Sequence, residues 1–142
     1  MRYFEEFDHP ADLALKVGAS DLPNLFLSAL EGMCYLITGE KIDIESGSIC
    51  TEFIKCQAST KEDLLVDWLS EFLFRVNVNH DIVVKMDLIN FITGNEGFEM
   101  SASVSFKTVD PSLLSEIKAV TYHQLNIIND NDGFSTVIVF DV

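Results

Sequence analysis

The chain of 142 residues is 48% hydrophobic and carries 23 Asp and Glu residues against 9 Lys and Arg residues, for a formal net charge of −14 at pH 7. This hydrophobic content excludes a disordered chain, and the longest apolar runs are too short to cross a bilayer. The acidity argues against direct binding of nucleic acid, because clustered cations are needed to grip a phosphate backbone. We expect one soluble domain, residues 1–142, whose charge either maintains solubility or attracts a basic protein.

The N-terminal residues predict two short strands followed by a helix. Residues 2–7 mix aromatic and charged side chains as a first strand, and residues 12–17 alternate polar and apolar side chains as a second, which Asp12 opens. A helix is predicted next over residues 23–38 and ends at Gly39. Its apolar residues recur three or four positions apart, at Phe26, Leu30, Met33, Cys34 and Ile37.

The middle of the chain predicts a third strand and a second amphipathic helix. Residues 41–48 are polar with some strand character, and residues 49–58 follow as a strand in which Phe53 and Ile54 are expected to be buried. A threonine with acidic residues shortly after it suits the start of a helix over residues 61–76. This helix carries a broad apolar stripe for packing across a sheet, made of Leu64, Leu65, Trp68, Leu69, Phe72, Leu73 and Val76.

After a turn at residues 77–81, the remaining pattern is typical of strands. Residues 82–92 and 98–106 are joined by a loop rich in Gly and Asn, which predicts a hairpin. Strands over residues 120–128 and 134–142 predict another hairpin about a second such turn. The whole pattern predicts an α+β fold: a single compact domain with a mixed or largely antiparallel β-sheet and two main helices packed on it.

The three cysteines, Cys34, Cys50 and Cys56, include no C-x-x-C pair and no histidine at a spacing suited to zinc. Neither a disulfide framework nor catalytic thiol chemistry is expected. Each cysteine has apolar or strand-forming neighbours, which favours a small buried side chain. The first residues carry no charged start followed by an apolar segment, so a cytoplasmic location is the default expectation.

Charged groups gather where the last hairpin is expected to close. Its turn places Asp141 roughly opposite the neighbourhood of Thr121, near Lys118, and Val142 adds an α-carboxylate beside Asp141. Asp12 brings a third carboxylate if the second strand reaches the same edge. Carboxylates that lie so close raise one another's pKa unless a cation such as Lys118, Ca²⁺ or Mg²⁺ compensates them.

Four segments together resemble the archease family. They are Asp8-His9-Pro10-Ala11-Asp12 near the start, residues 64–74 on the second helix, Ile117-Lys118-Ala119-Val120-Thr121-Tyr122-His123, and the closing Val139-Phe140-Asp141-Val142. They span essentially the whole chain in the family's order. Residues 110–115 depart from the family, because they lack the charged, histidine-bearing approach that is usual before the lysine, and this departure affects the expected partner surface.

The resemblance implies a small archease-like α+β protein that activates a partner enzyme and has no catalytic residues of its own. The partner is the GTP-dependent 3′-phosphate/5′-hydroxyl RNA ligase of tRNA splicing and RNA repair, whose guanylylation and multiple turnover such proteins promote. The resemblance also implies a divalent metal ion, Ca²⁺ with Mg²⁺ or Mn²⁺ as alternatives, held by Asp12, Asp141 and Val142. Lys118 and His123 are the residues implied in activation of the partner. Neither direct nucleic-acid binding nor membrane binding is expected.

The residues alone leave other interpretations open. Lys118 and His123 also suit ordinary polar positions of an edge strand. Asp12 and Asp141 also suit a metal-dependent hydrolase, although the sequence shows neither a nucleophile with an oriented base nor a phosphate-cradling glycine loop. A chaperone-like binding module without catalytic effect is a third interpretation.

Overall fold

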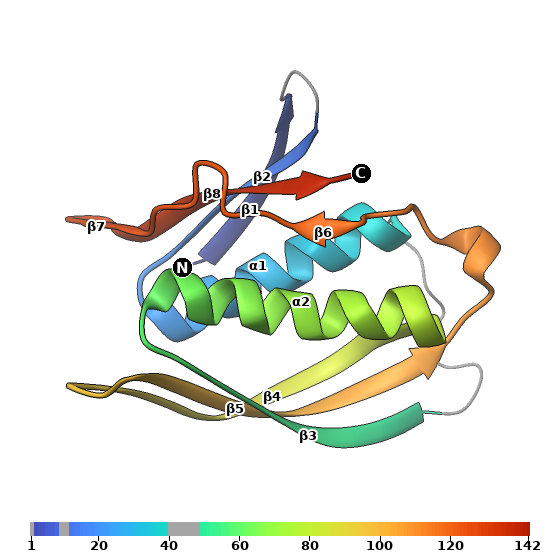
Figure 1. Cartoon of the computed structure of the whole chain (residues 1–142), viewed down its shortest axis with the longest axis horizontal. Helices are drawn as coiled ribbons and strands as arrows, with labels where there is room; N and C mark the ends of the chain where they lie inside the picture. The colour runs from blue at the N-terminus through green and yellow to red at the C-terminus, as the bar shows by residue number, and fades with distance from the viewer. Residues whose placement is uncertain (1, 9–11, 40–48) are drawn as a thin grey trace.

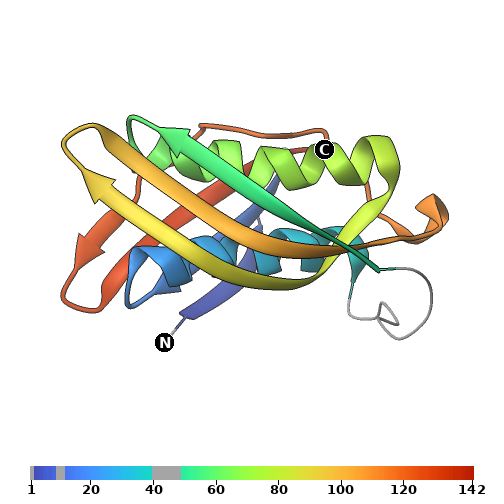
Figure 2. The same cartoon turned by 90° about the horizontal axis from the view of Figure 1, so that it is seen from below.

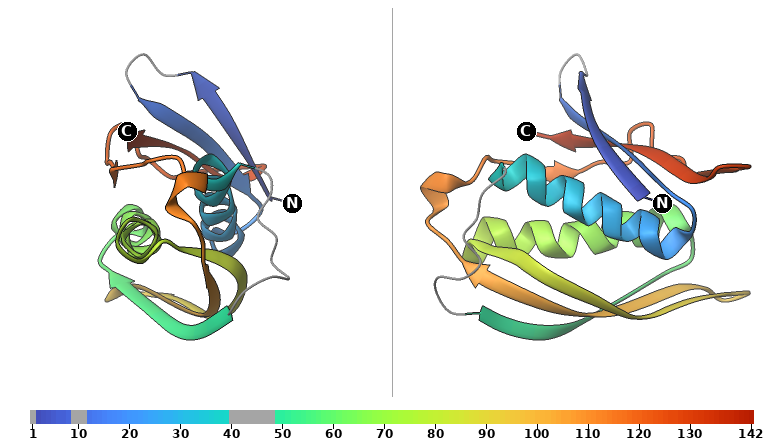
Figure 3. Two further views of the ribbon diagram at one scale, coloured as in Figure 1. Left: turned by 90° about the vertical axis from the view of Figure 1, so that its right-hand side faces the viewer. Right: turned by 180° about the vertical axis from the view of Figure 1, so that it is seen from behind.

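Two helices form the middle layer of the structure, a computed structural model that describes residues 2–8, 12–39 and 49–142. Helices α1 (Leu22–Thr38) and α2 (Lys61–Asn79) run beside each other, with one antiparallel sheet on either side (Figure 1; Figure 3, left). Neither of these described helices is long and apolar enough to cross a membrane. The three layers confirm the predicted α+β fold with two main helices.

The described strands divide into two antiparallel sheets, a finer arrangement than the single sheet predicted. The larger sheet has the order β1 (Arg2–Asp8), β2 (Leu13–Ala19), β8 (Gly133–Asp141) and β6 (Ala119–Val120), and β7 (Ile128–Asp130) also pairs with β8. The smaller sheet has the order β3 (Ile49–Ala58), β5 (Gly97–Thr108) and β4 (Asp81–Gly94). Figure 2 shows the three strands of the smaller sheet crossing the helices. Helices with apolar residues on opposite sides need a sheet on each side to bury them.

Side-chain caps begin both helices. Asp21 accepts a hydrogen bond from the backbone N–H of Asn24 at 2.9 Å at the start of α1. Thr60 accepts one from the backbone N–H of Asp63 at 3.0 Å at the start of α2, as the sequence predicted. These bonds satisfy backbone donors that have no partner within the helix. Gly39 then ends α1 with a positive φ of 71°.

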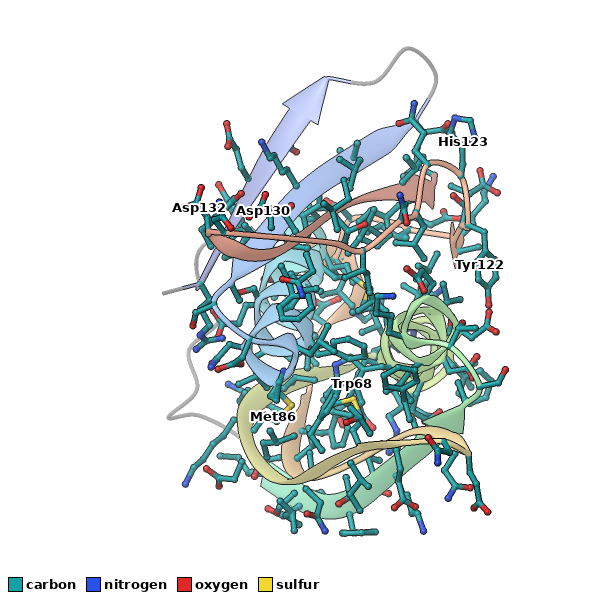
Figure 4. The ribbon with its side chains drawn as sticks, turned by 90° about the vertical axis from the view of Figure 1, so that its left-hand side faces the viewer. Trp68, Met86, Tyr122, His123, Asp130 and Asp132 are labelled. Carbon is teal, nitrogen blue, oxygen red and sulfur yellow. The ribbon has the colours of Figure 1, made fainter. Side chains whose placement is uncertain are left out.

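The hydrophobic core lies between the helices and the inner faces of the sheets. Trp68 on α2 is completely buried, and its ring meets that of Phe72 edge to face, with centroids 4.5 Å apart. The predicted apolar stripe of α2 is confirmed, because each of its seven residues is buried. In Figure 4, Trp68 points from α2 into the space above the smaller sheet.

Two sequence predictions in the middle of the chain are wrong in detail. Helix α2 continues to Asn79 instead of ending at residue 76, and the side chain of Asn77 contributes a tertiary contact to this last turn by donating to the carbonyl of Ile117 at 3.0 Å. Phe53 is 62% exposed, whereas Ile54 is 5% exposed. Successive side chains of a strand point to opposite faces, so only one of the two can reach the core. The predicted polar passage at residues 41–48 lies outside the described residues.

The predicted strand over residues 120–128 is also wrong. Strand β6 stops after Val120, and the chain turns until β7 begins at Ile128. The hydroxyl of Thr121 donates to the carbonyl of Val139 at 2.8 Å, and the backbone N–H of Leu125 donates to the carbonyl of Tyr122 at 3.1 Å, which closes a turn. Local hydrogen bonds of this kind compete with a continuous ladder.

Among the described residues the three cysteines form no disulfide, and only two of them are even partly buried. Cys34 and Cys56 are half-buried, whereas Cys50 at the start of β3 is exposed, so the expectation of burial is wrong for Cys50. Burial raises the pKa of the Cys34 thiol to about 12 and that of Cys56 to about 11, with Glu71 and Asp67 adding to the second shift. Both thiols are therefore protonated at neutral pH, which makes them poor nucleophiles.

Gly133 at the start of β8 is predicted to tolerate no side chain. Its φ is 118°, and a Cβ there would lie 2.3 Å from the carbonyl oxygen of Ala19. We expect Gly133→Ala to destabilise the protein by more than about 1 kcal/mol, because the backbone conformation and the contact both oppose the methyl group. Gly94→Ala is the control, since a Cβ at Gly94 meets nothing within 4 Å. Equal thermal unfolding midpoints for the two variants would contradict this prediction.

Candidate functional site

The end of strand β8 brings together three of the residues predicted for the site. Strand β8 lies between β2 and β6; Leu13 pairs with Phe140 on one side, and Ala119 pairs with Asp141 on the other. Asp12 comes directly before Leu13, and the backbone N–H of Lys118 donates to the carbonyl of Asp141 at 2.7 Å. Asp12, Lys118 and Asp141 therefore lie at one end of the larger sheet, on three neighbouring chain segments. Figure 1 shows β8 between β2 and β6.

The register differs from the prediction by two residues, although the outcome is the same. The predicted hairpin places Asp141 roughly opposite Thr121, whereas the structure pairs Asp141 with Ala119, and Thr121 bonds to Val139. Asp141 and Lys118 are exposed, Asp12 is half-buried, and Val142 is 48% exposed. We call this end of the sheet, defined by Asp12, Lys118, Asp141 and Val142, the acidic tip.

The donor atoms of the acidic tip fit a hard divalent cation. Asp12 and Asp141 each offer a carboxylate, and if Val142 ends the chain its α-carboxylate is a third oxygen donor. Ca²⁺, Mg²⁺ and Mn²⁺ all prefer oxygen ligands. In the described part of the chain no three His, Cys, Asp or Glu side chains gather as a metal-binding group. A site built from the tip therefore needs that main-chain carboxylate or water to complete it.

Lys118 also faces a pocket at the C-terminal end of α2. The pocket is open, has a volume of about 480 Å³ and is lined in part by Asn77, His80, Ser115 and Glu116. Among the described residues Lys118 has no carboxylate within ion-pair distance. The side chain of Lys118 is exposed, so its ammonium group is open to solvent.

Helix α2 holds the segment that carries Lys118 and His123. Besides the bond from Asn77 to Ile117, the carboxylate of Glu62 accepts the backbone N–H of Ile127 at 3.0 Å. Between them the hydroxyl of Tyr122 donates to the carboxylate of Asp63, and this bond is the largest reason why the pKa of Tyr122 rises to about 12. Figure 4 shows Tyr122 beside α2 and His123 farther out on the same side.

These tethers are what sequence reasoning missed. Glu62 and Asp63 were interpreted only as acidic residues favourable to the helix N-terminus, and Asn77 was assigned to a turn. The position of His123 is set locally, because its backbone N–H donates to the hydroxyl of Thr121 at 3.2 Å. The signal in the sequence was a polar residue at each end of the apolar helix, Glu62 at the start and Asn77 near the end. Such residues can bond to a neighbouring segment.

Glu62→Ala tests the tether to Ile127. The backbone N–H of Ile127 belongs to a residue only 5% exposed, and Glu62 is its acceptor. We expect the variant to lose about 1–3 kcal/mol of unfolding free energy, because a buried donor is left without a partner. Hydrogen exchange at the Ile127 amide should also become faster in this variant. Asp67→Ala, one turn farther along α2 and exposed, is the matched control. Slow exchange at Ile127 in the Glu62 variant would contradict the prediction.

The three layers and the acidic tip define a small α+β protein. In this protein the polar ends of strands β2 and β8 lie beside Lys118, whose segment is held by α2. Residues 4–142 match the Archease protein family (MTH1598/TM1083), and the chain belongs to this family. Similar proteins include the archease of Methanosarcina barkeri, 30% identical over 99% of this chain and 97% of the relative, and that of Methanosarcina acetivorans, 32% identical over 98% and 95%.

Two solved structures share the fold. One is the solution structure of Methanobacterium thermoautotrophicum protein 1598, with a TM-score of 0.77 and 22% identity over 98% of both chains. The other is the crystal structure of an archease from Thermotoga maritima, described as a possible chaperone, with a TM-score of 0.60 and 19% identity over 97% of this chain and 96% of that one. At these identities the likeness concerns the three-layer arrangement.

Proposed function

We propose that this archease-family protein activates a GTP-dependent RNA ligase that joins 3′-phosphate and 5′-hydroxyl ends in tRNA splicing and RNA repair. It acts by promoting guanylylation of the ligase and its repeated turnover, and it catalyses no reaction alone. The observation that carries this proposal is the register of β8, which brings Asp12, Lys118 and Asp141 to one exposed end of the sheet. The net charge of −14 favours a protein partner over direct contact with RNA.

The acidic tip suits a role beside nucleotide phosphates. Asp12, Asp141 and Val142 are the residues that would hold a divalent ion, which when bound supplies positive charge toward phosphate oxygens. Lys118 adds a cation on a segment fixed by its backbone bond to Asp141 and by the tether from Asn77. Preorganised charges of this kind lower the free energy of phosphoryl and nucleotidyl transfer, because they need no reorganisation during the reaction. His123 lies on the same segment and is proposed to contact the partner.

A ligase assay distinguishes this function from the alternatives. The protein is added to purified ligase with GTP and an RNA carrying a 3′-phosphate, and is also incubated alone with the same nucleotide and RNA. An activator accelerates guanylylation and has no activity alone, whereas a hydrolase consumes nucleotide or RNA alone. A chaperone-like module changes neither rate but raises the recovery of folded ligase. The absence of any acceleration at saturating protein would refute the proposal.

The metal at the acidic tip has its own test. We expect Asp12→Asn and Asp141→Asn each to weaken binding of Ca²⁺ or Mn²⁺ by at least about tenfold, because each change removes a charged ligand while conserving its shape. Titration calorimetry measures the affinity, and the unfolding midpoint verifies that the fold is intact. Asp87→Asn, an exposed aspartate on the smaller sheet, is the matched control. Wild-type affinity in both tip variants would show that the metal is held elsewhere.

A further inference from the structure

Helix α2 presents an outer face that the core does not use. Along this face Asp63, Asp67 and Glu71 occupy the first half, and Phe74 and Val78 the second, at spacings of three and four residues that align them in one stripe. Phe74 is 59% exposed and Val78 is 57% exposed. We call these five residues the α2 stripe; it is acidic at one end and apolar at the other, and it runs for about 22 Å along the helix.

Among the described residues the acidic half of the stripe is only partly compensated: Glu71 pairs with Arg75 at 3.6 Å, and Asp63 accepts the hydroxyl of Tyr122. Arg75 turns inward: its side chain is 17% exposed, its guanidinium lies 4.7 Å from the centroid of the Phe106 ring, and it pairs with Glu52 more closely than with Glu71. Lys61 approaches Glu62, which lies off the stripe, at 3.7 Å. In the described chain no Lys or Arg lies within ion-pair distance of Asp67. Carboxylates at this spacing repel one another, so the stripe costs the free helix some stability.

The stripe leads directly to the segment that carries Lys118. Its apolar end lies in the same helical turns as Val76 and Asn77, which line the pocket together with Lys118. Strand β6 runs beside this part of α2, and Figure 1 shows the two elements on the same face of the molecule. A protein surface that touches the acidic tip and Lys118 is therefore close enough to extend along the stripe.

We propose that the α2 stripe is the docking surface for the enzyme that the acidic tip serves, and that the matching surface of this partner is basic with an apolar centre. The identity of the partner rests on the proposed function. Three carboxylates repel RNA and anionic lipid, and they attract lysine and arginine side chains. Phe74 and Val78 gain from contact only with apolar side chains, and a large exposed aromatic residue is a typical centre of a binding surface.

Two measurements distinguish docking of the ligase from its activation. Binding of the purified ligase to the immobilised protein gives association and dissociation rates, and titration of the protein into the guanylylation assay gives a half-maximal concentration and a plateau. We expect Phe74→Ala to weaken binding by about tenfold, chiefly by faster dissociation. Asp67→Lys should slow association by about threefold to tenfold and reduce its dependence on salt. Both variants should raise the half-maximal concentration and leave the plateau unchanged.

Matched controls lie on two strands of the smaller sheet, outside the α2 stripe. Phe53→Ala on β3 removes an aromatic side chain with 62% exposure, and Asp87→Lys on β4 reverses an exposed charge. These two variants should bind like the wild type. Wild-type binding by the Phe74 and Asp67 variants, or equal weakening by the controls, would overturn the proposed docking surface.

The two proposals fail in different ways. If the wild-type protein binds the ligase without accelerating it, the proposed function falls, and the binding of the Phe74 and Asp67 variants still decides whether the stripe is the contact. If the variants bind normally and activation persists, only the docking surface falls. If the wild-type protein does not bind the ligase, both proposals fall.

Discussion

Lys118→Ala is expected to lower the plateau of ligase guanylylation by on the order of a hundredfold, because removing one preorganised donor from a site of developing charge typically costs about a hundredfold to a thousandfold in rate. Lys118 is exposed, no described carboxylate lies within ion-pair distance of it, and its backbone N–H bond to Asp141 holds its segment in place. The plateau at saturating protein is the quantity to measure, since it reports action after binding.

Stability serves as the internal check on this result. An exposed lysine contributes at most about 1 kcal/mol to folding, so the thermal unfolding midpoint of Lys118→Ala should be close to that of the wild type. Lys85→Ala is the control, because it removes the same type of side chain, 71% exposed, from the smaller sheet. An unchanged plateau for Lys118→Ala would remove this residue from the working surface.

The second large effect concerns the core. Trp68→Ala should destabilise the protein by about 3–5 kcal/mol, because the ring is completely buried and packs on Phe72 between the layers. Chemical denaturation gives the free energy, and the thermal midpoint should fall by roughly 10 °C or more. Phe53→Ala, which removes a mostly exposed ring, should change stability much less.

Trp68→Phe refines this prediction. Within the described residues the buried indole N–H of Trp68 has no hydrogen-bond acceptor, so phenylalanine removes an unsatisfied polar group while it keeps an aromatic ring in the core. This variant should therefore lose clearly less free energy of unfolding than Trp68→Ala. An equal loss would mean that the exact volume of the indole, and not burial of an aromatic ring, sets the stability.

Local signals in the sequence predicted both helices and the hairpin of β4 and β5. The start of α2 was predictable because the Thr60 cap and the spacing of the apolar residues are both local features of the helix. The split into two sheets was not predictable in the same way, because alternation defines which side chains share a face and not which helix that face covers. Phe53 shows the same limit. Phe53 and Ile54 are neighbouring apolar residues of one strand, and without the partner strand the sequence does not say which of them faces the core.

The residues of the acidic tip were predictable from the sequence, but the contacts that hold the Lys118 segment in place were not. Asp141 and Lys118 follow from a hairpin whose turn is visible in the sequence, and Asp12 follows from its place at the start of the second predicted strand. The interruption after Val120 depends on hydrogen bonds from Thr121 to Val139, which lie far apart in the chain. The contacts of Glu62 and Asn77 with the Lys118 segment are likewise tertiary, and no local pattern encodes them.

The pairing of β2 with β8 sets the order in which the protein can mature on the ribosome. Strand β2 is made early, but its neighbour β8 lies far downstream in the chain, so Leu13 cannot pair with Phe140 until all the residues between them have been made. Contacts so distant in sequence slow folding, and β2 keeps an unpaired edge meanwhile. Asp12 and Asp141 come together only when β8 is inserted beside β2. The acidic tip therefore exists only on molecules whose larger sheet is finished, and incomplete chains cannot present it to a partner.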